Sequence, residues 1–184
     1  MGPKGRGSNM RAIVEACAAG RVAANVQVVV SPLDTSPAAD FVRAQGLKLS
    51  RVTPGENYEQ ELFGALEGVT LICLAGYTRL LPLALVEAYR GSILNIHPAL
   101  LPKFGGKGMY GTHVHEAVLA AGETESGCTV HKVTPVYDEG EIVLQMKCPV
   151  LPDDTAETLS ARVLQLEHVA YPEALKKVIH ERSR

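Results

Sequence analysis

The sequence predicts an α/β fold, with a Rossmann-like, mostly parallel sheet flanked by helices and an antiparallel C-terminal portion. Three observations lead there. Short apolar runs rich in β-branched residues alternate with helically periodic stretches as far as Gly122. Two strand-like runs then flank the turn sequence YDEG. A long amphipathic stretch follows. Because no linker, repeat or low-complexity tract interrupts the 184 residues, we predict a single domain over residues 1–184.

The alternating part is bounded by residues that begin and end helices. Met10, Ile13 and Val14 recur at helical spacing, and we expect Ser8 or Asn9 to cap this helix. The run VQVVV is typical of a strand that is buried on both faces. The pattern predicts helices at 10–20, 38–45, 58–66, 82–89 and 112–121, and strands at 26–30, 47–52, 69–76 and 92–96.

After Gly127, strand-like and helix-like runs no longer alternate. CTVHKVTPV and EIVLQMKCPV predict two strands that return on each other across YDEG, as in a hairpin. A helix is then expected over residues 156–179, with a possible kink at Pro172. One apolar stripe should line that helix, formed by Leu159, Val163, Leu166, Val169 and Ala170.

Composition narrows the class of protein. The chain is 46% hydrophobic and 21% charged, with a net charge of −2, which is typical of a soluble protein without general affinity for nucleic acid or membrane surfaces. No apolar run approaches the roughly 20 residues that a membrane span needs. The start of the sequence lacks the apolar middle of a secretory signal, so we expect a cytoplasmic protein. Monomer and homodimer both remain open.

The histidines and cysteines do not favour a metal site. Cys128 and His131 have a metal-like spacing, but residues i and i+3 of a strand face opposite ways. His113 and His115 are two apart on an expected helix, where their side chains diverge. We therefore predict no metal and expect these three histidines to be solvent-facing or structural. The four scattered cysteines are expected to be reduced packing residues.

A glycine-containing loop, Gly5-Arg6-Gly7-Ser8-Asn9, opens the first helix. Glycines and free N–H groups at a helix N-terminus suit a phosphate, although the same residues are common in ordinary helix caps. Such a loop normally follows a strand, and the preceding MGPK does not have the sequence of one. We therefore expect the first strand to be missing before Gly5, which would leave the sheet short of a strand beside this loop.

Asn95 and His97 lie near the C-terminal end of an expected strand and are followed by a glycine-rich loop. Spaced by two, they face the same side. An Asn amide can donate to a developing oxyanion, and a His can transfer a proton near neutral pH. The pair therefore suits attack on a carbonyl, while a structural His beside a turn-forming proline is an equally valid interpretation.

No activated nucleophile accompanies this pair, since Ser92 is not in a Gly-x-Ser-x-Gly setting. Direct transfer between two substrates, or hydrolysis by water, fits better than an acyl-enzyme. Asp138 lies in the YDEG turn. It is either an ordinary turn aspartate or a carboxylate that folds back against His97 and raises its pKa.

Several motifs, in this order, resemble the folate-dependent formyltransferases, and among them the glycinamide ribonucleotide formyltransferases of purine synthesis. The likeness extends from about Gly5 to near the C-terminus, and Asn-x-His-Pro with a later Asp-x-Gly is its most specific part. The motifs are GRGSN, LAGYTRLLP, LNIHPALLPKFGGKG, SGCTVH, VYDEGEIVLQ and RVLQLEHVAYPEAL.

The resemblance implies that the formyl group of 10-formyltetrahydrofolate passes to the amine of 5-phosphoribosylglycinamide without a metal. Asn95 would hold the carbonyl oxygen, His97 would donate a proton, and Asp138 would raise the pKa of His97. The remaining roles are also implied by the family. The ribonucleotide would contact Gly7, Ser8, Asn9 and Glu167, and the folate would contact Thr78, Arg79, Leu80, Leu81, Asn95, Val136, Tyr137 and Asp138.

Two other functions remain open at this point. A 10-formyltetrahydrofolate hydrolase shares the Asn-x-His-Pro motif and the aspartate. A non-catalytic module that binds folate or nucleotide would keep the pocket without turnover. Of these functions, only the transferase requires the amine substrate before tetrahydrofolate is released.

Overall fold

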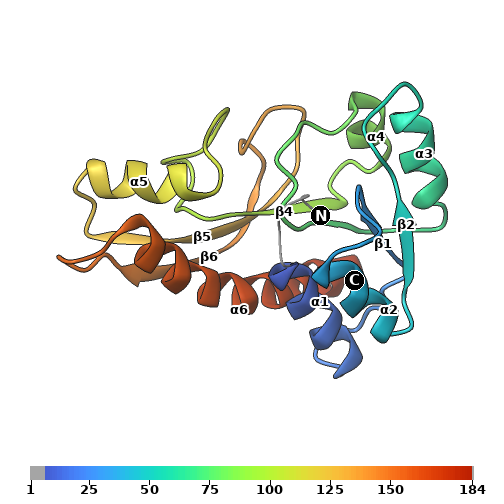
Figure 1. Ribbon diagram of the computed structural model, residues 1–184, viewed down its shortest axis with the longest axis horizontal. Helices are drawn as coiled ribbons and strands as arrows, with labels where there is room; N and C mark the ends of the chain where they lie inside the picture. Colours follow the sequence, from blue (N-terminus) through green and yellow to red (C-terminus); the bar gives the residue numbers. More distant parts are fainter. Residues whose placement is uncertain (1–6, 184) are drawn as a thin grey trace.

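Helices lie on both sides of a broken sheet in the computed structural model, which describes residues 7–183 (Figure 1). The strands are β1 (Val28–Ser31), β2 (Lys48–Arg51), β3 (Ile72–Leu74), β4 (Ile93–His97), β5 (Glu125–Lys132) and β6 (Ile142–Pro149). The helices are α1 (Ser8–Ala18), α2 (Pro37–Ala44), α3 (Tyr58–Ala65), α4 (Leu83–Ala88), α5 (Thr112–Ala120) and α6 (Ala156–Arg182).

The strand pairing changes from parallel to antiparallel along the chain. β1 and β2 form a parallel pair, and β3 pairs in parallel with β4. β4–β5 and β5–β6 are antiparallel, in the strand order β3-β4-β5-β6. In Figure 1, α1, α2 and α6 lie on one side of these strands and α3, α4 and α5 on the other. This arrangement confirms the predicted α/β class and its antiparallel C-terminal portion.

Two local expectations were wrong. The N-cap of α1 is Gly7, which has a left-handed backbone (φ 69°) and provides no side-chain cap bond. Ser8 and Asn9, the expected caps, lie inside the helix. On α6, Val169 is 53% exposed, and the neighbouring Glu167 takes a buried position instead. The strand expected to be missing before Gly5 concerns residues 1–6, which lie outside the described residues.

The long helix α6 connects the N-terminal helix α1 with the C-terminal strands β5 and β6. It packs against α1, α5, β5 and β6, and it continues through Pro172 as one element. Thr155 and Thr158 close its N-terminus with reciprocal hydrogen bonds, which satisfies donors that a helix start leaves free. Tyr171, fully buried, directs its hydroxyl to the carbonyl oxygens of Leu74 and Leu94, 2.9 Å from each. The helix thereby braces the β3–β4 pair.

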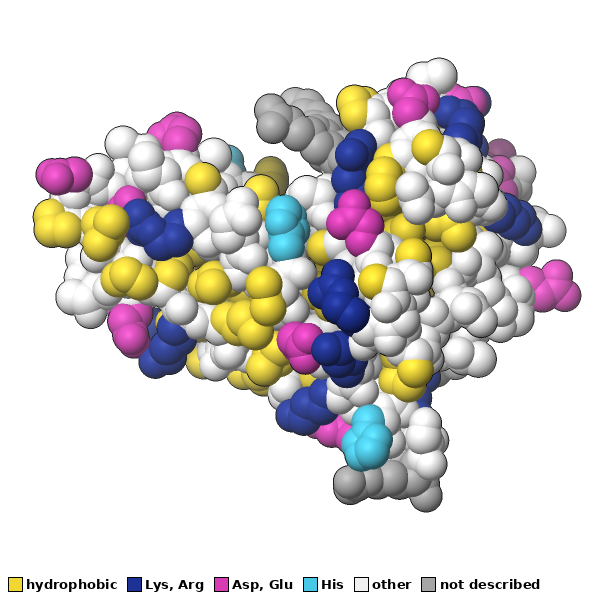
Figure 2. Space-filling model, turned by 90° about the horizontal axis from the view of Figure 1, so that it is seen from below, with side chains coloured by type: hydrophobic (Ala, Val, Ile, Leu, Met, Phe, Trp, Pro, Cys, Tyr) yellow, Lys and Arg dark blue, Asp and Glu magenta, His cyan; other side chains and the backbone are white. Residues whose placement is uncertain are grey.

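The surface carries both signs of charge. Lys and Arg side chains alternate with Asp and Glu over the face shown in Figure 2, in keeping with the small net charge. Among the described residues, none of the helices combines the length and apolar character needed to cross a lipid bilayer.

Replacing Tyr171 by Phe should lower the free energy of unfolding by about 1–3 kcal/mol, because the carbonyls of Leu74 and Leu94 lose a buried donor. Urea unfolding measures the change. Tyr110→Phe is the matched control, since the Tyr110 side chain is 51% exposed, and its effect should stay within about 0.5 kcal/mol. Equal losses in the two variants would contradict the bracing role of the Tyr171 hydroxyl.

Candidate active site

The two predicted catalytic residues of β4 lie beside a strand that supplies a third polar side chain. His97 is 4% exposed and Asn95 is half-buried. In the antiparallel β4–β5 register, Asn95 is opposite His131, and His97 is opposite Thr129. Directly opposed residues of a sheet bring their side chains within contact distance. The register therefore adds His131 to the Asn95–His97 pair.

Asp138 returns to this pair from the loop between β5 and β6. Its backbone is left-handed (φ 56°), and its Oδ2 lies 3.6 Å from His97 Nδ1. The N–H of Gly106 donates to the same oxygen at 2.9 Å. The other carboxylate oxygen, Oδ1, is 3.4 Å from His131 Nε2. A single carboxylate thus joins both histidines and the glycine-rich loop.

His131 was expected to be solvent-facing or structural, and the structure excludes the first alternative, because it buries His131 beside Asn95 and Asp138. Its Nδ1 lies 3.0 Å from the Lys132 carbonyl, to which an Nδ1–H donates. Its Nε2 lies 3.1 Å from the Asn95 amide nitrogen and 3.4 Å from Asp138 Oδ1. His131 therefore orients the Asn95 side chain as well as contacting Asp138.

Burial and the neighbouring polar groups have opposite effects on the pKa values of His97 and Asp138. Burial lowers the pKa of His97, against the opposing effects of Asp138 and the Phe104 carbonyl. Burial alone would raise the pKa of Asp138, but hydrogen bonds from His131 and Gly106 and the nearby His97 hold that pKa below its ordinary value. The expected upward influence of Asp138 on His97 is present, yet desolvation outweighs it. The carboxylate stays ionised beside a predominantly neutral imidazole.

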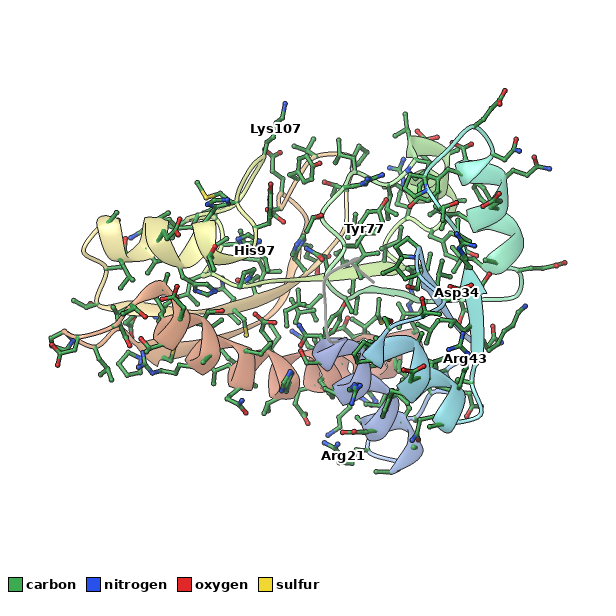
Figure 3. The ribbon with its side chains drawn as sticks, viewed as in Figure 1. Arg21, Asp34, Arg43, Tyr77, His97 and Lys107 are labelled. Atoms are coloured by element: carbon green, nitrogen blue, oxygen red, sulfur yellow. The ribbon has the colours of Figure 1, made fainter. Side chains whose placement is uncertain are left out.

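The loop after β4 covers His97. The Phe104 carbonyl accepts from His97 Nε2 at 2.7 Å, with Phe104 itself in a left-handed conformation (φ 56°). At Gly105 an added Cβ would lie 2.6 Å from Leu101 Cδ2 and 3.2 Å from Asp138 Cβ, so a side chain at this position would force both neighbours to shift. In Figure 3, His97 lies beneath this loop, and Lys107 points away from it at the loop's tip.

Buried polar side chains of β5 and β6 fix the start of the same loop. Thr129 Oγ1 donates to the Ala99 carbonyl at 2.6 Å and accepts from the Leu101 N–H at 3.1 Å. Gln145 Nε2 donates to the Leu101 carbonyl and to Thr129 Oγ1, at 2.8 and 2.9 Å. Beyond this anchor, Leu101, Gly106 and Asp138 border a cavity of about 440 Å³. A ligand in this cavity would lie beside Asp138 and the loop between β5 and β6.

Of the residues expected to contact a ribonucleotide, Asn9 and Glu167 contact each other. Asn9 Nδ2 donates to Glu167 Oε2 at 2.6 Å across the α1–α6 contact. Glu167 is 8% exposed, and burial raises its pKa against the opposing hydrogen bond from Asn9. Gly7 and Ser8 lie at the start of α1, which in Figure 1 points toward β4. Asn9 Oδ1 is buried without a hydrogen-bond partner among the described residues.

The residues expected to contact folate lie in two loops. Thr78, Arg79, Leu80 and Leu81 follow β3, and Val136, Tyr137 and Asp138 follow β5. Leu80 and Val136 are 51% and 53% exposed, while Leu81 packs against the apolar cluster under α3 and α4. Burial raises the pKa of Tyr77, labelled in Figure 3, and the nearby Tyr137 adds to this rise, so the two loops lie close to each other.

The two histidines of α5 differ from each other. His113 is exposed, as expected, whereas His115 is buried at 2% and its Nδ1 has no hydrogen-bond partner within residues 7–183. Burial, followed by the nearby His97, lowers the pKa of His115. Among the described residues, no three His, Cys, Asp or Glu side chains gather in a way that could hold a metal ion.

Comparison with known proteins identifies the family. Residues 4–175 match the formyl transferase family. The chain belongs to this family. A chloroplastic phosphoribosylglycinamide formyltransferase of Arabidopsis thaliana is 41% identical over 97% of this chain and 64% of its own length. The Escherichia coli phosphoribosylglycinamide formyltransferase is 35% identical over 91% of this chain and 80% of its own length.

Solved formyltransferase structures have the same fold. A glycinamide ribonucleotide transformylase from Symbiobacterium toebii superposes with a TM-score of 0.85, at 38% identity over 94% of this chain and 82% of that one. The resemblance predicted from the motifs is thereby confirmed. The chain spans 64% of the Arabidopsis formyltransferase's length. A formyltetrahydrofolate deformylase from Pseudomonas syringae shares the fold at 20% identity and a TM-score of 0.86.

His115 gives this family member a testable pH dependence. Because its folded-state pKa is below the ordinary 6.5, the unfolded chain binds protons more readily, and stability is lost as pH falls through that value. His115→Gln should reduce the loss of unfolding free energy between about pH 7.5 and 5.5 by about 1 kcal/mol. His113→Gln, at an exposed site, is the control in urea titrations. Identical pH slopes in wild type and His115→Gln would contradict this assignment.

Proposed function

We propose that the protein transfers the formyl group of 10-formyltetrahydrofolate to the amine of 5-phosphoribosylglycinamide, in de novo purine biosynthesis. The observation that carries the proposal is that Asp138, which lines the cavity, contacts His97, while His131 links Asp138 to Asn95. The names of the similar proteins support the same substrates. Both substrates are small molecules, and no metal or nucleic acid takes part in the proposed reaction.

The chemistry follows from the atoms at the site. The glycinamide nitrogen attacks the formyl carbon, and the carbonyl oxygen gains negative charge. The Asn95 amide nitrogen is a donor for that oxygen in a partly buried setting, where a hydrogen bond to a developing anion is strong. Collapse of the tetrahedral intermediate breaks the bond to the folate nitrogen, which leaves with a proton. The attacking nitrogen loses its own proton in the same sequence.

His97 is the group placed to move that proton. A histidine whose pKa lies below its ordinary value is mostly in the neutral form at neutral pH, so it can accept a proton, and once protonated it is a stronger acid toward the folate nitrogen. The ionised Asp138 stabilises the imidazolium while it exists, at 3.6 Å from Nδ1. Before the ring can serve a substrate through Nε2, the Phe104 carbonyl must release it. Movement of the glycine-rich loop is therefore part of the proposed cycle.

The binding roles fit the surroundings of this group. The start of α1 offers backbone N–H groups to a phosphate, with Asn9 and Glu167 beside it for a ribose or an amine. Leu80 and Val136 expose apolar surface in two neighbouring loops, which suits a flat pterin ring. The two ligand sites would then approach the catalytic residues from different sides.

Tetrahydrofolate release provides the direct test. The protein is incubated with 10-formyltetrahydrofolate in the presence or absence of 5-phosphoribosylglycinamide, and absorbance reports the product. We expect release only when the amine is present. Release without the amine would instead establish a hydrolase, and saturable ligand binding without turnover would establish a non-catalytic module.

His97→Ala should lower turnover by about two to four orders of magnitude, because the proton donor is lost while the fold is retained. His113→Ala is the matched control, since the His113 side chain is 63% exposed, and its turnover should match the wild type. Circular dichroism checks that both variants are folded. Near-wild-type turnover of His97→Ala would remove His97 from the mechanism.

His131→Gln tests the positioning role of the third histidine. The variant should lower kcat about tenfold or more, because Asn95 and Asp138 lose the ring that orients them. The KM for the ribonucleotide should change little, because none of its expected contacts involves His131, Asn95 or Asp138. The pH profile of kcat should also shift, since Asp138 loses a donor. An unchanged kcat and profile would contradict this role.

A further inference from the structure

Four side-chain hydrogen bonds anchor the start of the loop that covers His97. Thr129 Oγ1 donates to the Ala99 carbonyl and accepts from the Leu101 N–H, at 2.6 and 3.1 Å. Gln145 Nε2 donates to the Leu101 carbonyl and to Thr129 Oγ1, at 2.8 and 2.9 Å. Because the hydroxyl oxygen already accepts from two N–H groups, its own hydrogen goes to the Ala99 carbonyl. We call this group the Thr129–Gln145 clamp.

The clamp acts on the covering carbonyl through Leu101. Both backbone groups of Leu101 are bound by the clamp, and the residue is 4% exposed. Leu101 Cδ2 lies 2.6 Å from the point that a Cβ on Gly105 would occupy, so this side chain packs directly against Gly105. The Phe104–Gly105 peptide carries the carbonyl that accepts from His97 Nε2 at 2.7 Å. The position of Leu101 therefore determines where that carbonyl lies.

The covering loop has a second attachment, beside the cavity of about 440 Å³. The Gly106 N–H donates to Asp138 Oδ2 at 2.9 Å, and both residues line that cavity. Thr129, in contrast, is fully buried. A ligand that enters the cavity can therefore displace the Gly106 end of the loop, while the clamp keeps the Leu101 end in place.

We propose that the two clamp residues are positioning residues, which hold the Phe104 carbonyl on His97 and so confine tetrahydrofolate release to the complex that contains the amine. The link to tetrahydrofolate release rests on the formyl transfer proposed above. His97 Nε2 becomes free only when its bond to the covering carbonyl breaks, and binding of the amine substrate supplies the free energy for this change. A water molecule supplies no comparable binding free energy.

The reaction that the clamp suppresses is hydrolysis of the formyl donor. In that reaction water adds to the formyl carbon, the bond to the folate nitrogen breaks, and formic acid leaves. One hydrogen of the water passes to the folate nitrogen through His97, and the other stays on the formic acid until it ionises. Hydrolysis needs the same free Nε2 as formyl transfer does. A clamp that holds the covering carbonyl in place therefore withholds the base from water.

Two substitutions remove clamp bonds with little change in side-chain volume. Gln145→Met removes both amide donors, and Thr129→Val removes the hydroxyl, so each leaves part of the Leu101 backbone unpaired. Thr129→Ser keeps the hydroxyl and should preserve the clamp. Gln60→Met is the matched control, because Gln60 is exposed on α3. Gln145 is only half-buried, so Gln145→Met provides the test if Thr129→Val does not fold.

Carbethoxylation by diethyl pyrocarbonate measures the cover over His97 without any assay of activity. The reagent modifies accessible neutral imidazole nitrogens, and peptide mass spectrometry gives a rate for each histidine. Gln145→Met should speed modification of His97 about tenfold, because the loss of buried hydrogen bonds shifts the opening of the loop by about that factor. The exposed His180 and the buried His131 should keep their wild-type rates. An unchanged rate at His97, or an equal rise at His131, would overturn the positioning role.

Tetrahydrofolate release tests the consequence for specificity. Without 5-phosphoribosylglycinamide, Gln145→Met and Thr129→Val should release tetrahydrofolate and formate from 10-formyltetrahydrofolate about tenfold faster than the wild type, whereas Thr129→Ser and Gln60→Met should retain the low wild-type rate. The KM for the amine should change little, since none of its expected contacts involves the clamp. A variant that uncovers His97 without any rise in amine-independent release would overturn the role in specificity.

The two measurements separate this proposal from the proposed function. A wild type that transfers no formyl group would refute the proposed function and the role in specificity, while the carbethoxylation rates would still decide whether the clamp holds the cover. A wild type that transfers the formyl group, with equal His97 carbethoxylation in Gln145→Met, would leave the proposed function standing and overturn the clamp.

Discussion

The site depends on the contacts that the ionised carboxylate of Asp138 makes with two histidines and a backbone N–H. One oxygen accepts from the Gly106 N–H and faces His97, and the other faces His131. A side chain that is only 10% exposed keeps its charge because these partners replace the water it has lost. The Asp138 carboxylate therefore connects its own turn to the glycine-rich loop, to β4 and to β5. Removing it would leave two buried imidazoles and a loop without their common partner.

The same arrangement explains why β5 matters as much as β4. The antiparallel register sets His131 against Asn95 and Thr129 against His97, so one strand orients the amide and also anchors the covering loop. Thr129 and Gln145 satisfy the loop's buried backbone at Ala99 and Leu101, which keeps the segment after His97 in place.

Local periodicity was enough to predict the helices and strands, because apolar spacing and glycine stops act within one element. It could not assign His131, whose role comes from the strand opposite it, since register is a property of two segments. Similarly, the α6 stripe predicted Val169 as buried, although the partner of Asn9 is the buried Glu167. The contact of Asp138 with His97 was a hypothesis from the motif, because a turn's sequence does not determine which side chain it meets.

The bond between His97 Nε2 and the Phe104 carbonyl occupies the nitrogen that the proposed proton transfer would use. In the proposed reaction, a formyl donor that binds alone would meet an imidazole whose Nε2 is already bonded, so His97 would not assist attack by water. Only a ligand that displaces the covering backbone unmasks that nitrogen. If the proposed reaction is correct, the Phe104 carbonyl would thus limit loss of the formyl group to water.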